Sequence, residues 1–395
     1  MLYAAILGFG TVGSGVAEVL TDNQALLTQK LGQELRLKYI LDTREFPGNP
    51  FEDRIIHDFA VIEQDPQVQL VAECIGGATI AYEFVKRCLQ AGKHVATSNK
   101  ELVATKGHEL LEIAKAHNVN FFFEASVGGG IPVLRPLYFD LAGNQISQVA
   151  GIVNGTTNYI LSKMLDEDAA FADVLKDAQA KGYAEANPAA DVGGLDACRK
   201  VCILSALAFG FHVYPDMVST EGITGITEAD VAVAAAGNMK LKLLGRTLRT
   251  DDGRICAFVA PHFVPQDSQL AHVDGVFNAL LIRGNAIGEA MFYGPGAGKL
   301  PTASAVVGDL ADAAWHLETR RPLDWDDARP DAMLDAADLP LPYIIRTNAS
   351  LTQVESALGA ARPLGEDGYL LDGVHTRRAI EAAGLELLAV RPVFN

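Results

Sequence analysis

The sequence has few of the features that mark secreted or membrane-spanning proteins. Its five cysteines are an odd number without a C-x-x-C pair, and most lie in apolar segments, which favours buried, reduced thiols and a cytoplasmic location. The first ten residues, MLYAAILGFG, lack a positively charged region and lead directly into a glycine turn, as a first strand does and a signal peptide does not. The longest mostly apolar run, residues 201–213, is far shorter than the roughly 20 residues that cross a bilayer, so we expect a buried helix there.

Basic residues are also scarce. The chain has 32 Lys+Arg against 49 Asp+Glu, a formal net charge of −17, and no local basic patch. Such a chain repels nucleic acid and anionic membranes, so we expect neither as a partner. Internal repeats and low-complexity tracts are absent as well, and the 395 residues are enough for two or three domains.

The first third of the chain alternates short apolar runs with helical patterns. This alternation is typical of a parallel sheet with helices on both faces, so we predict a doubly wound α/β fold. The strands are expected at residues 2–7, 35–41, 70–75, 94–97 and 120–124, and the helices at residues 12–30, 80–91 and 102–117.

The pattern of expected strands and helices changes after residue 130, where the segments become longer. We predict an α+β domain there, followed by a polar, proline-bearing linker at residues 326–331. Beyond the linker, the pattern predicts strand, helix, two strands, helix and strand over residues 342–390. This βαββαβ order suggests a small ferredoxin-like module.

A glycine-rich turn joins the first expected strand to the first expected helix. Its sequence, Gly8-Phe9-Gly10-Thr11-Val12-Gly13, is the G-x-G-x-x-G pattern in the context where that pattern indicates a dinucleotide site of the Rossmann type. Gly8 permits the tight turn, Gly10 lets the backbone approach a pyrophosphate, and Gly13 lets the helix pack on the strand. The helix N-terminus then favours the phosphate charge. The alternative is a purely structural glycine turn.

The end of the second expected strand leaves the choice of dinucleotide open. Asp42 suits a ribose hydroxyl, whereas Arg44 suits a 2′-phosphate. We therefore expect NAD or NADP.

Charged residues are concentrated in the stretch GYAEANPAADVGGLDACRK, residues 182–200. Asp196 and Lys200 lie four residues apart at the start of an apolar helix, so they share one helical face, and by themselves they could be a structural ion pair. Glu185 and Asp191 precede them in the loop. Crowded carboxylates need a cation, which the ammonium group of an amino-acid substrate would supply. An enzyme that oxidises its hydroxyl needs a group that exchanges a proton, and Lys200 is the candidate.

Three motifs, in order along the chain, resemble homoserine dehydrogenases. They are Asn154-Gly155-Thr156-Thr157-Asn158, the run at residues 182–200, and GPGAG at residues 294–298 with PTASAVV at residues 301–307. Members of that family interconvert L-aspartate 4-semialdehyde and L-homoserine with NAD(P)H, in threonine, methionine and isoleucine biosynthesis. The resemblance covers roughly residues 2–317.

The resemblance implies roles for individual residues. Lys200 would donate the proton to the aldehyde oxygen, with Asp196 and Lys100 also in the catalytic group. The implied substrate-binding residues are Glu185, Asp191, Asp196 and Thr156. The implied cofactor-binding residues are Gly8, Gly10, Thr11, Val12, Gly13, Ser98, Lys100, Gly182 and Gly298.

A glycine-rich stretch at residues 123–132 resembles the monovalent-cation loop of the same family. It implicates Glu124 and the backbone carbonyls of Val127, Gly129 and Ile131, which suit a hard cation, expected to be sodium. The same stretch also suits a hinge between two domains.

The resemblance also implies the domain boundaries and the assembly. We expect a dinucleotide-binding domain at residues 1–130 plus 298–320, a substrate-binding and dimerisation domain at 131–297, and an ACT-like module at 335–395. The module lacks the D-x-P-G turn common near the ligand of ACT domains, so its effector is left open. A homodimer or homotetramer is expected.

Two other functions remain as alternatives for this sequence. They are a dehydrogenase of another small hydroxy or amino acid and a catalytically silent nucleotide-binding sensor.

Overall fold

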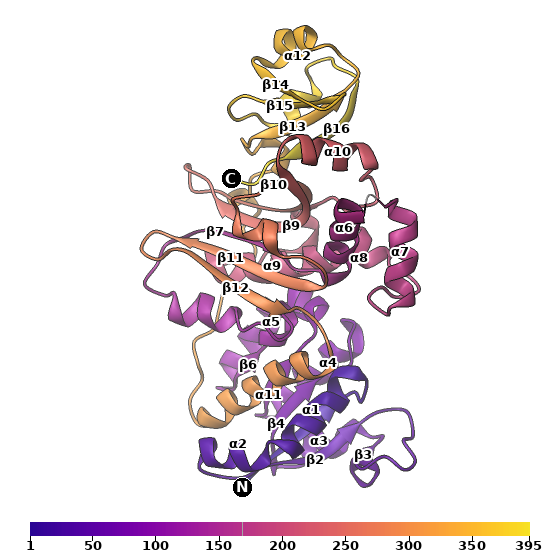
Figure 1. Ribbon diagram of the computed structural model, residues 1–395. Coiled ribbons are helices and arrows are strands. Elements are labelled where there is room, and N and C mark those ends of the chain that lie inside the picture. The colour runs from indigo at the N-terminus through magenta and orange to yellow at the C-terminus, as the bar shows by residue number, and fades with distance from the viewer. Residues whose placement is uncertain (168) are drawn as a thin grey trace. The chain divides into compact units, whose positions relative to one another are not determined.

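A six-stranded parallel sheet organises the amino-terminal part of the chain (Figure 1). Its strand order is β3-β2-β1-β4-β5-β6, in which the chain moves outward from β1 on one side and then on the other. The predicted doubly wound fold is therefore confirmed. The strands are β1 (Leu2–Leu7), β2 (Leu35–Leu41), β3 (Ile55–Ile56), β4 (Val68–Glu73), β5 (His94–Thr97) and β6 (Phe121–Phe122).

The computed structural model describes residues 1–167 and 169–395, which form two compact units. The first unit comprises Met1–Gly143, Ala206–Tyr214 and Gly294–Ala328, and the second comprises Asn144–Ser205, Pro215–Tyr293 and Arg329–Asn395.

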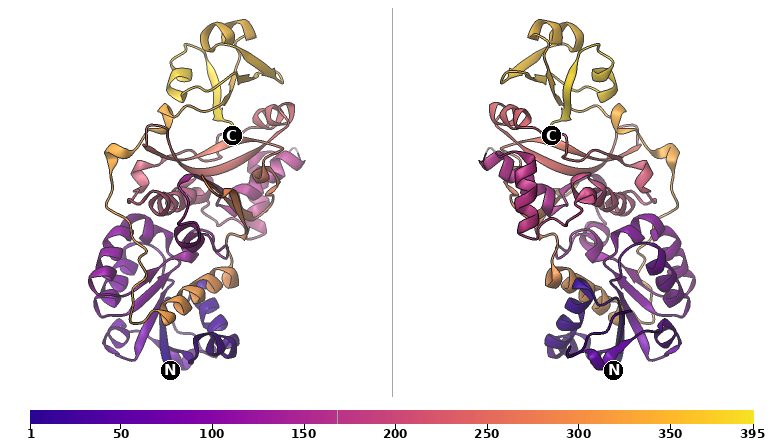
Figure 2. Two further views of the ribbon diagram at one scale, coloured as in Figure 1. Left: turned by 90° about the vertical axis from the view of Figure 1, so that its left-hand side faces the viewer. Right: turned by 90° about the vertical axis from the view of Figure 1, so that its right-hand side faces the viewer.

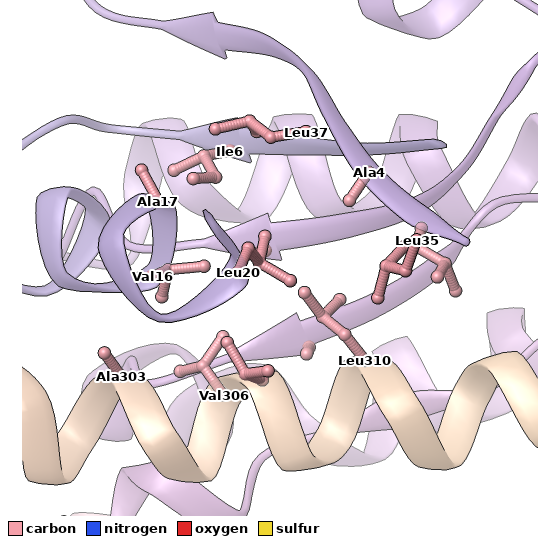
Figure 3. Close-up of a cluster of buried hydrophobic side chains, with 14 of the residues drawn as sticks. Ala4, Ile6, Val16, Ala17, Leu20, Leu35, Leu37, Ala303, Val306 and Leu310 are labelled. Carbon is pink, nitrogen blue, oxygen red and sulfur yellow. The ribbon is translucent and has the colours of Figure 1, made fainter. Parts of the chain in front are cut away.

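Helices cover both faces of the parallel sheet (Figure 2). One face carries α1 (Thr11–Asp22), α2 (Gln24–Leu31) and α11 (Lys299–Trp315), and the other carries α3 (Phe59–Gln64), α4 (Thr79–Gln90) and α5 (Lys100–Ala116). The apolar residues of α11 recur at helical spacing and pack against α1 and the sheet, although α11 comes from far along the sequence (Figure 3). The labelled members of this core are Ala4, Ile6, Val16, Ala17, Leu20, Leu35, Leu37, Ala303, Val306 and Leu310.

Two local expectations for the first unit were wrong. The single helix expected at residues 12–30 is two helices, because Asn23 leaves the helical conformation with φ −100° and ψ 16°. Asparagine favours such a junction since its side chain competes for backbone hydrogen bonds. The short elements β3 and α3 were not expected. Strand β3 has only two residues, which is too few to produce a periodic pattern in the sequence.

A second, mostly antiparallel sheet organises the second unit. Its order is β12-β11-β7-β9-β10-β8. The pairs β11–β7, β7–β9 and β9–β10 are antiparallel, whereas the short β8 pairs with β10 in parallel. The strands are β7 (Ile146–Ile152), β8 (Ser219–Thr220), β9 (Met239–Arg249), β10 (Ile255–Pro265), β11 (Phe277–Gly284) and β12 (Gly288–Pro295). The helices are α6 (Gly155–Glu167), α7 (Phe171–Ala180), α8 (Ala189–Val192), α9 (Leu195–Phe209), which belongs to this unit as far as Ser205, and α10 (Glu228–Ala236).

The carboxy-terminal module has the predicted βαββαβ order. Its four-stranded sheet has the order β14-β15-β13-β16, the ferredoxin-like arrangement. Its core continues into β10 through Cys256, Phe258 and Ala260, and the last residues return to the same strand, where the Phe394 amide donates to the Phe263 carbonyl at 2.8 Å (Figure 2). The elements are β13 (Tyr343–Thr347), α12 (Leu351–Leu358), β14 (Ala361–Leu364), β15 (Gly368–Leu371), α13 (Arg377–Glu381) and β16 (Leu387–Pro392).

The segment expected to be a linker is anchored to the first unit over its first residues. The Asp326 carbonyl accepts the His212 amide at 2.8 Å, and the neighbouring Trp325, only 4% exposed, donates its indole N–H to His212 Nδ1 at 3.0 Å. These partners lie more than a hundred positions away in the sequence, so local composition could not reveal the anchoring.

The thiols and the lengths of the helices can be compared with the expectations of buried, reduced cysteines and of no membrane-spanning segment. All five cysteines are free, and four of them are buried. Burial raises the pKa of the Cys88 and Cys256 thiols to about 12. Across residues 1–167 and 169–395, every helix is too short or too polar to cross a bilayer.

Candidate active site

The glycine turn of the first unit lies at the carboxyl end of β1. Gly8 has φ 89°, and its amide donates to the Leu41 carbonyl of β2 at 2.8 Å. A Cβ atom on Gly13 would lie 1.9 Å from the Gly8 carbonyl oxygen, so only glycine lets α1 begin this close to the strand. Thr11 and Val12 then open α1, and the capping residue Gly10 has no side chain to engage the first helical amides. Such an uncapped N-terminus suits a phosphate group.

Asp42 and Arg44 form a bidentate pair beside this turn. Arg44 Nε and Nη2 each donate to one Asp42 carboxylate oxygen at 3.0 Å, and the amides of Phe9 and Arg44 donate to the same carboxylate at 2.7 Å and 3.0 Å. Arg44 holds the pKa of Asp42 well below its usual range. Both residues that sequence reasoning weighed for the ribose are therefore bound to each other.

A buried network joins the carboxyl ends of β4 and β5. Glu73 is fully buried and accepts the Thr97 hydroxyl at 2.5 Å and the Ile75 amide at 2.7 Å, and burial raises its pKa. Asn99 caps α5 by accepting the Leu102 amide at 3.1 Å. The network fixes the turn that contains Ser98 and Lys100, two of the predicted cofactor residues. Sequence reasoning missed Glu73, although an acid that ends a buried parallel strand is itself a signal.

The predicted cation loop follows β6 and is held at both ends. The Glu124 carboxylate accepts the amides of Val133, Leu134 and Arg135 at 2.6, 2.8 and 2.8 Å. The Glu124 amide donates to Asp309 of α11 at 2.9 Å. Burial raises the pKa of Asp309 to about 8.

Three residues predicted from the sequence to bind the cation lie between these anchors. They are Val127, Gly129 and Ile131. Gly129, with φ 59°, lies so close to Gly296 that an added Cβ would be 2.4 Å from its carbonyl oxygen. Nearby, Gly298, with φ 123°, precedes α11. The loop, the GPGAG segment and α11 therefore form one packed group within the first unit.

Lys200 lies in a buried polar cluster of the second unit. Its amine donates to the Val153 carbonyl at 2.5 Å and pairs with Asp196 Oδ2 at 2.8 Å, and both charged side chains are 8% exposed. Asn154 donates from Nδ2 to Asp196 at 3.0 Å and to Asp191 at 2.8 Å. The structure thus gathers three of the predicted charged residues from α8 and α9 around the end of β7.

Asn154 is the member of this cluster that sequence reasoning missed as a site residue. Its Oδ1 accepts the Thr157 amide at 2.9 Å, so one side chain both begins α6 and bridges two carboxylates. An asparagine directly after a strand and three residues before a threonine is a helix-start pattern. This local pattern could have identified Asn154 as a site residue. From the sequence, Asn154 was interpreted only as part of the motif at residues 154–158.

The remaining predicted substrate residues lie in or against the loop after α7. The Thr156 hydroxyl donates to the Tyr183 carbonyl at 2.6 Å, and Gly182 has φ 74° at the end of α7. Glu185 is exposed, and Gln179 holds its backbone carbonyl at 3.1 Å. Among the described residues, the Glu185 side chain therefore stays outside the hydrogen-bonded cluster of Lys200.

Known proteins match this chain over most of its length. The family model described as homoserine dehydrogenase, NAD binding domain, matches residues 8–124, and the model described as homoserine dehydrogenase matches residues 132–311. The homoserine dehydrogenase of Pseudomonas aeruginosa is 38% identical over 393 residues, which cover 96% of this chain and 89% of that protein. The chain belongs to the homoserine dehydrogenase family.

Solved structures of homoserine dehydrogenases agree with this assignment. The enzyme from Thiobacillus denitrificans superimposes with a TM-score of 0.90 at 35% identity, covering 100% of this chain and 98% of that one. A hyperthermophilic archaeal homoserine dehydrogenase in complex with NADPH has a TM-score of 0.66 at 27% identity and covers 79% of this chain and 97% of that one.

Family membership confirms the function expected from the sequence motifs. The protein is an NAD(P)-dependent oxidoreductase that acts on a hydroxyl group, as homoserine dehydrogenases do. The catalytically silent sensor and the dehydrogenase of another small hydroxy or amino acid are not favoured.

Proposed function

We propose that the cluster of Asn154, Asp191, Asp196 and Lys200 is the substrate end of this homoserine dehydrogenase site, with Lys200 as the proton-exchanging group. The observation that carries the proposal is the buried Lys200 amine, held by a carboxylate at 2.8 Å and a peptide carbonyl at 2.5 Å. An amine held so firmly has a defined direction, which proton transfer requires.

The nicotinamide dinucleotide supplies or accepts the hydride when it is bound. In the reducing direction, the Lys200 ammonium gives its proton to the aldehyde oxygen as the carbon gains the hydride, and the product is the alcohol of homoserine. In the oxidising direction, the neutral amine takes the hydroxyl proton. Asp196 orients the amine, and Lys100, the first residue of α5, is proposed as the second catalytic lysine.

The carboxylates of the second unit are proposed to recognise the ammonium group of the substrate. Asp191 is oriented by Asn154. Glu185, which is exposed in the loop after α7, is proposed to contact the same ammonium group when the substrate is bound. Thr156 supports that loop through Tyr183. A charge-assisted contact of this kind distinguishes an amino acid from a simple hydroxy acid.

An absorbance assay at the nicotinamide band tests the whole proposal. The purified protein is mixed with L-homoserine and either NAD or NADP, and with 4-hydroxybutyrate as a substrate that lacks the ammonium group. We expect reduction of the cofactor with homoserine and little with 4-hydroxybutyrate. Equal rates with the two alcohols would contradict the role given to the carboxylates, and no rate with homoserine would contradict the function.

The glycine turn is proposed to hold the pyrophosphate of the dinucleotide, with Gly10 against it. Gly10 has φ −82°, which any residue can adopt, and nothing lies within 4 Å of the position of an added Cβ. Gly10→Ala should therefore leave the unfolding midpoint unchanged, yet the methyl group enters the space proposed for the ligand. We expect the Kd of NAD(P)H, measured by fluorescence titration, to rise at least about tenfold. Gly143→Ala is the control for a glycine outside the turn, because Gly143 also has no positive φ and open space around an added Cβ. Unchanged cofactor affinity in Gly10→Ala would contradict the assignment.

We further propose that NADP(H) is accepted as readily as NAD(H), or preferred. Arg44 and two amides already occupy the Asp42 carboxylate, so the acid that would repel a 2′-phosphate is neutralised. The Arg44 side chain is 60% exposed and lies over the Phe46 ring at 5.0 Å, where it can meet that phosphate. The NADPH complex of the archaeal relative supports the same reading.

Arg44→Ala is expected to change the KM values for NADPH and NADH by different amounts. Removal of the guanidinium frees Asp42 to face the ribose, so we expect the KM for NADPH to rise about tenfold or more and the KM for NADH to change less than about twofold. Arg36→Ala, which removes another exposed arginine of the same unit, should change neither. An equal loss with both cofactors would indicate that Arg44 only supports the turn.

A sodium ion is proposed to bind the loop after β6 through peptide oxygens. The amides of Val133, Leu134 and Arg135 occupy the carboxylate of Glu124, so its peptide carbonyl is the proposed ligand, together with those of Val127, Gly129 and Ile131. A set of neutral oxygens on a turning loop suits a hard monovalent cation.

We infer a homo-oligomer in the cytoplasm. The edge strand β12 and its neighbour β11 expose Phe277, Met291 and Tyr293, and the two aromatic rings stack at 5.2 Å. An exposed apolar cluster on a sheet edge supports a contact with a second copy of the chain. The five free thiols support a reducing compartment.

A further inference from the structure

The carboxy-terminal module contacts the rest of the second unit through a partly exposed charge network centred on Glu221. Arg377 of α13 donates to Glu221 Oε2 at 2.8 Å, and Arg391 of β16 donates to Glu221 Oε1 at 2.9 Å. Arg391 is 5% exposed and also contacts the Gly225 carbonyl at 2.9 Å. Two arginines from separate elements of the module thus hold one carboxylate that lies outside the module.

Glu221 begins a turn that packs tightly against the end of α8. A Cβ atom on Gly222 would lie 2.0 Å from the Val192 carbonyl oxygen, so only glycine allows the approach. The next amide, Ile223, donates to the same Val192 carbonyl at 2.8 Å. The Glu221 amide itself donates to Val259 of β10 at 2.8 Å.

The segment under this turn carries the groups assigned to the substrate. Val192 directly follows Asp191, and Gly193 and Gly194 lead into α9, on which Asp196 and Lys200 lie. The two glycines leave the corner between α8 and α9 with little stiffness of its own, because glycine restricts the backbone less than any other residue. The orientation of α8 relative to α9 therefore depends on what packs against the corner. The turn from Glu221 to Ile223 is one of these groups, together with the side chains of Thr220 and Val259.

We propose that Glu221, clamped by Arg377 and Arg391 of the carboxy-terminal module, is a positioning residue for the substrate end of the site. It acts through Gly222 and Val192 on Asp191, and through Asn154 on Asp196 and Lys200. The module then has a role in catalysis that requires no effector: it fixes the corner between α8 and α9. This inference rests on the proposed role of the Lys200 cluster.

A double-mutant cycle between Glu221 and Arg377 tests the proposal. Arg377 is chosen because it is more exposed than Arg391, so its loss is less of a risk to the fold. Glu221→Gln and Arg377→Gln should each lower kcat/KM for homoserine about threefold to tenfold with the KM for NAD(P) unchanged, and the double variant should lose no more than Glu221→Gln alone. The matched control is Arg378→Gln, which removes the neighbouring arginine of α13, paired with Asp338 instead. Homoserine kinetics of the Glu221 and Arg377 variants within about 1.5-fold of the parent, multiplicative losses in the double variant, or an equal loss of cofactor affinity would overturn the proposal.

Hydrogen exchange of the intact protein decides the proposal independently of activity. We expect faster exchange in the peptides that span residues 187–200 in Glu221→Gln and Arg377→Gln, and no change there in Arg378→Gln. Unchanged exchange in this segment would overturn the inference even if the kinetics changed. A parent protein without homoserine activity would instead refute the proposed function, and the exchange result would still decide whether Glu221 positions the corner.

Discussion

Lys200→Met is expected to lower kcat at least about a hundredfold in both directions while the Kd of NAD(P)H stays within about twofold of the parent value. Methionine fills the space of the lysine side chain up to its terminal amine, but it can neither give nor take a proton. The expected loss therefore falls on the chemical step. Stopped-flow measurement of hydride transfer with a saturating substrate checks it directly.

The control for this prediction is a second buried lysine of the same unit. Lys242 is fully buried in β9 and pairs with Asp274 at 2.8 Å and with the Val273 carbonyl at 2.6 Å. Lys242→Met should lower the unfolding midpoint, because it leaves Asp274 without this partner, but the turnover of the folded fraction should remain near that of the parent. If Lys200→Met kept near-normal turnover, the proton would have to come from another group. That result would contradict the role of Lys200 as the proton-exchanging residue.

Asn154→Asp is expected to lower kcat/KM for homoserine about thirtyfold or more. The substitution is nearly isosteric and keeps an acceptor for the Thr157 amide, so the start of α6 is preserved. It replaces the amide that donates to Asp191 and Asp196 by a third carboxylate at 2.8–3.0 Å from them. Like charges at this distance either separate or take up a proton, and both outcomes disturb the direction of the Lys200 amine.

The two outcomes can be told apart by measurement. If the carboxylates separate, the loss should appear at all pH values, whereas proton uptake should shift the pH profile of kcat/KM relative to the parent. Asn23→Asp, at the junction of α1 and α2, is the control for the same change at another helix start. Parent-like kinetics in Asn154→Asp would show that the bridge is structural and that Asn154 has no part in positioning the site.

Much of the first unit was predictable because its signals are local. The alternation of apolar runs and helical patterns placed β1, β2 and β5 at their observed bounds, and the glycine spacing placed the turn between β1 and α1. The module at the carboxy-terminal end was likewise predicted in the correct order. These features follow from the period of side chains along a strand or helix and from the backbone freedom of glycine.

Contacts between distant segments were not predictable in the same way. Asn154 was read as part of a motif, and nothing near it in the sequence indicated that it joins Asp191 and Asp196. Asp42 and Arg44 were weighed as alternatives for one ribose, whereas the folded chain binds them to each other. Glu73 was not noticed as a site residue, and its partner Thr97 of β5 lies 24 positions away in the sequence.

By itself, the sequence determined the types and order of the elements, the dinucleotide turn and the set of charged residues to consider, because each depends on residues close together in the chain. Only the tertiary structure decided which of those residues meet. Lys200 reaches a carbonyl 47 positions away, and Asn154 reaches a carboxylate 42 positions away. Such contacts arise where the packing of a whole unit brings strand and helix ends together, and no local pattern of residues encodes the distances between them.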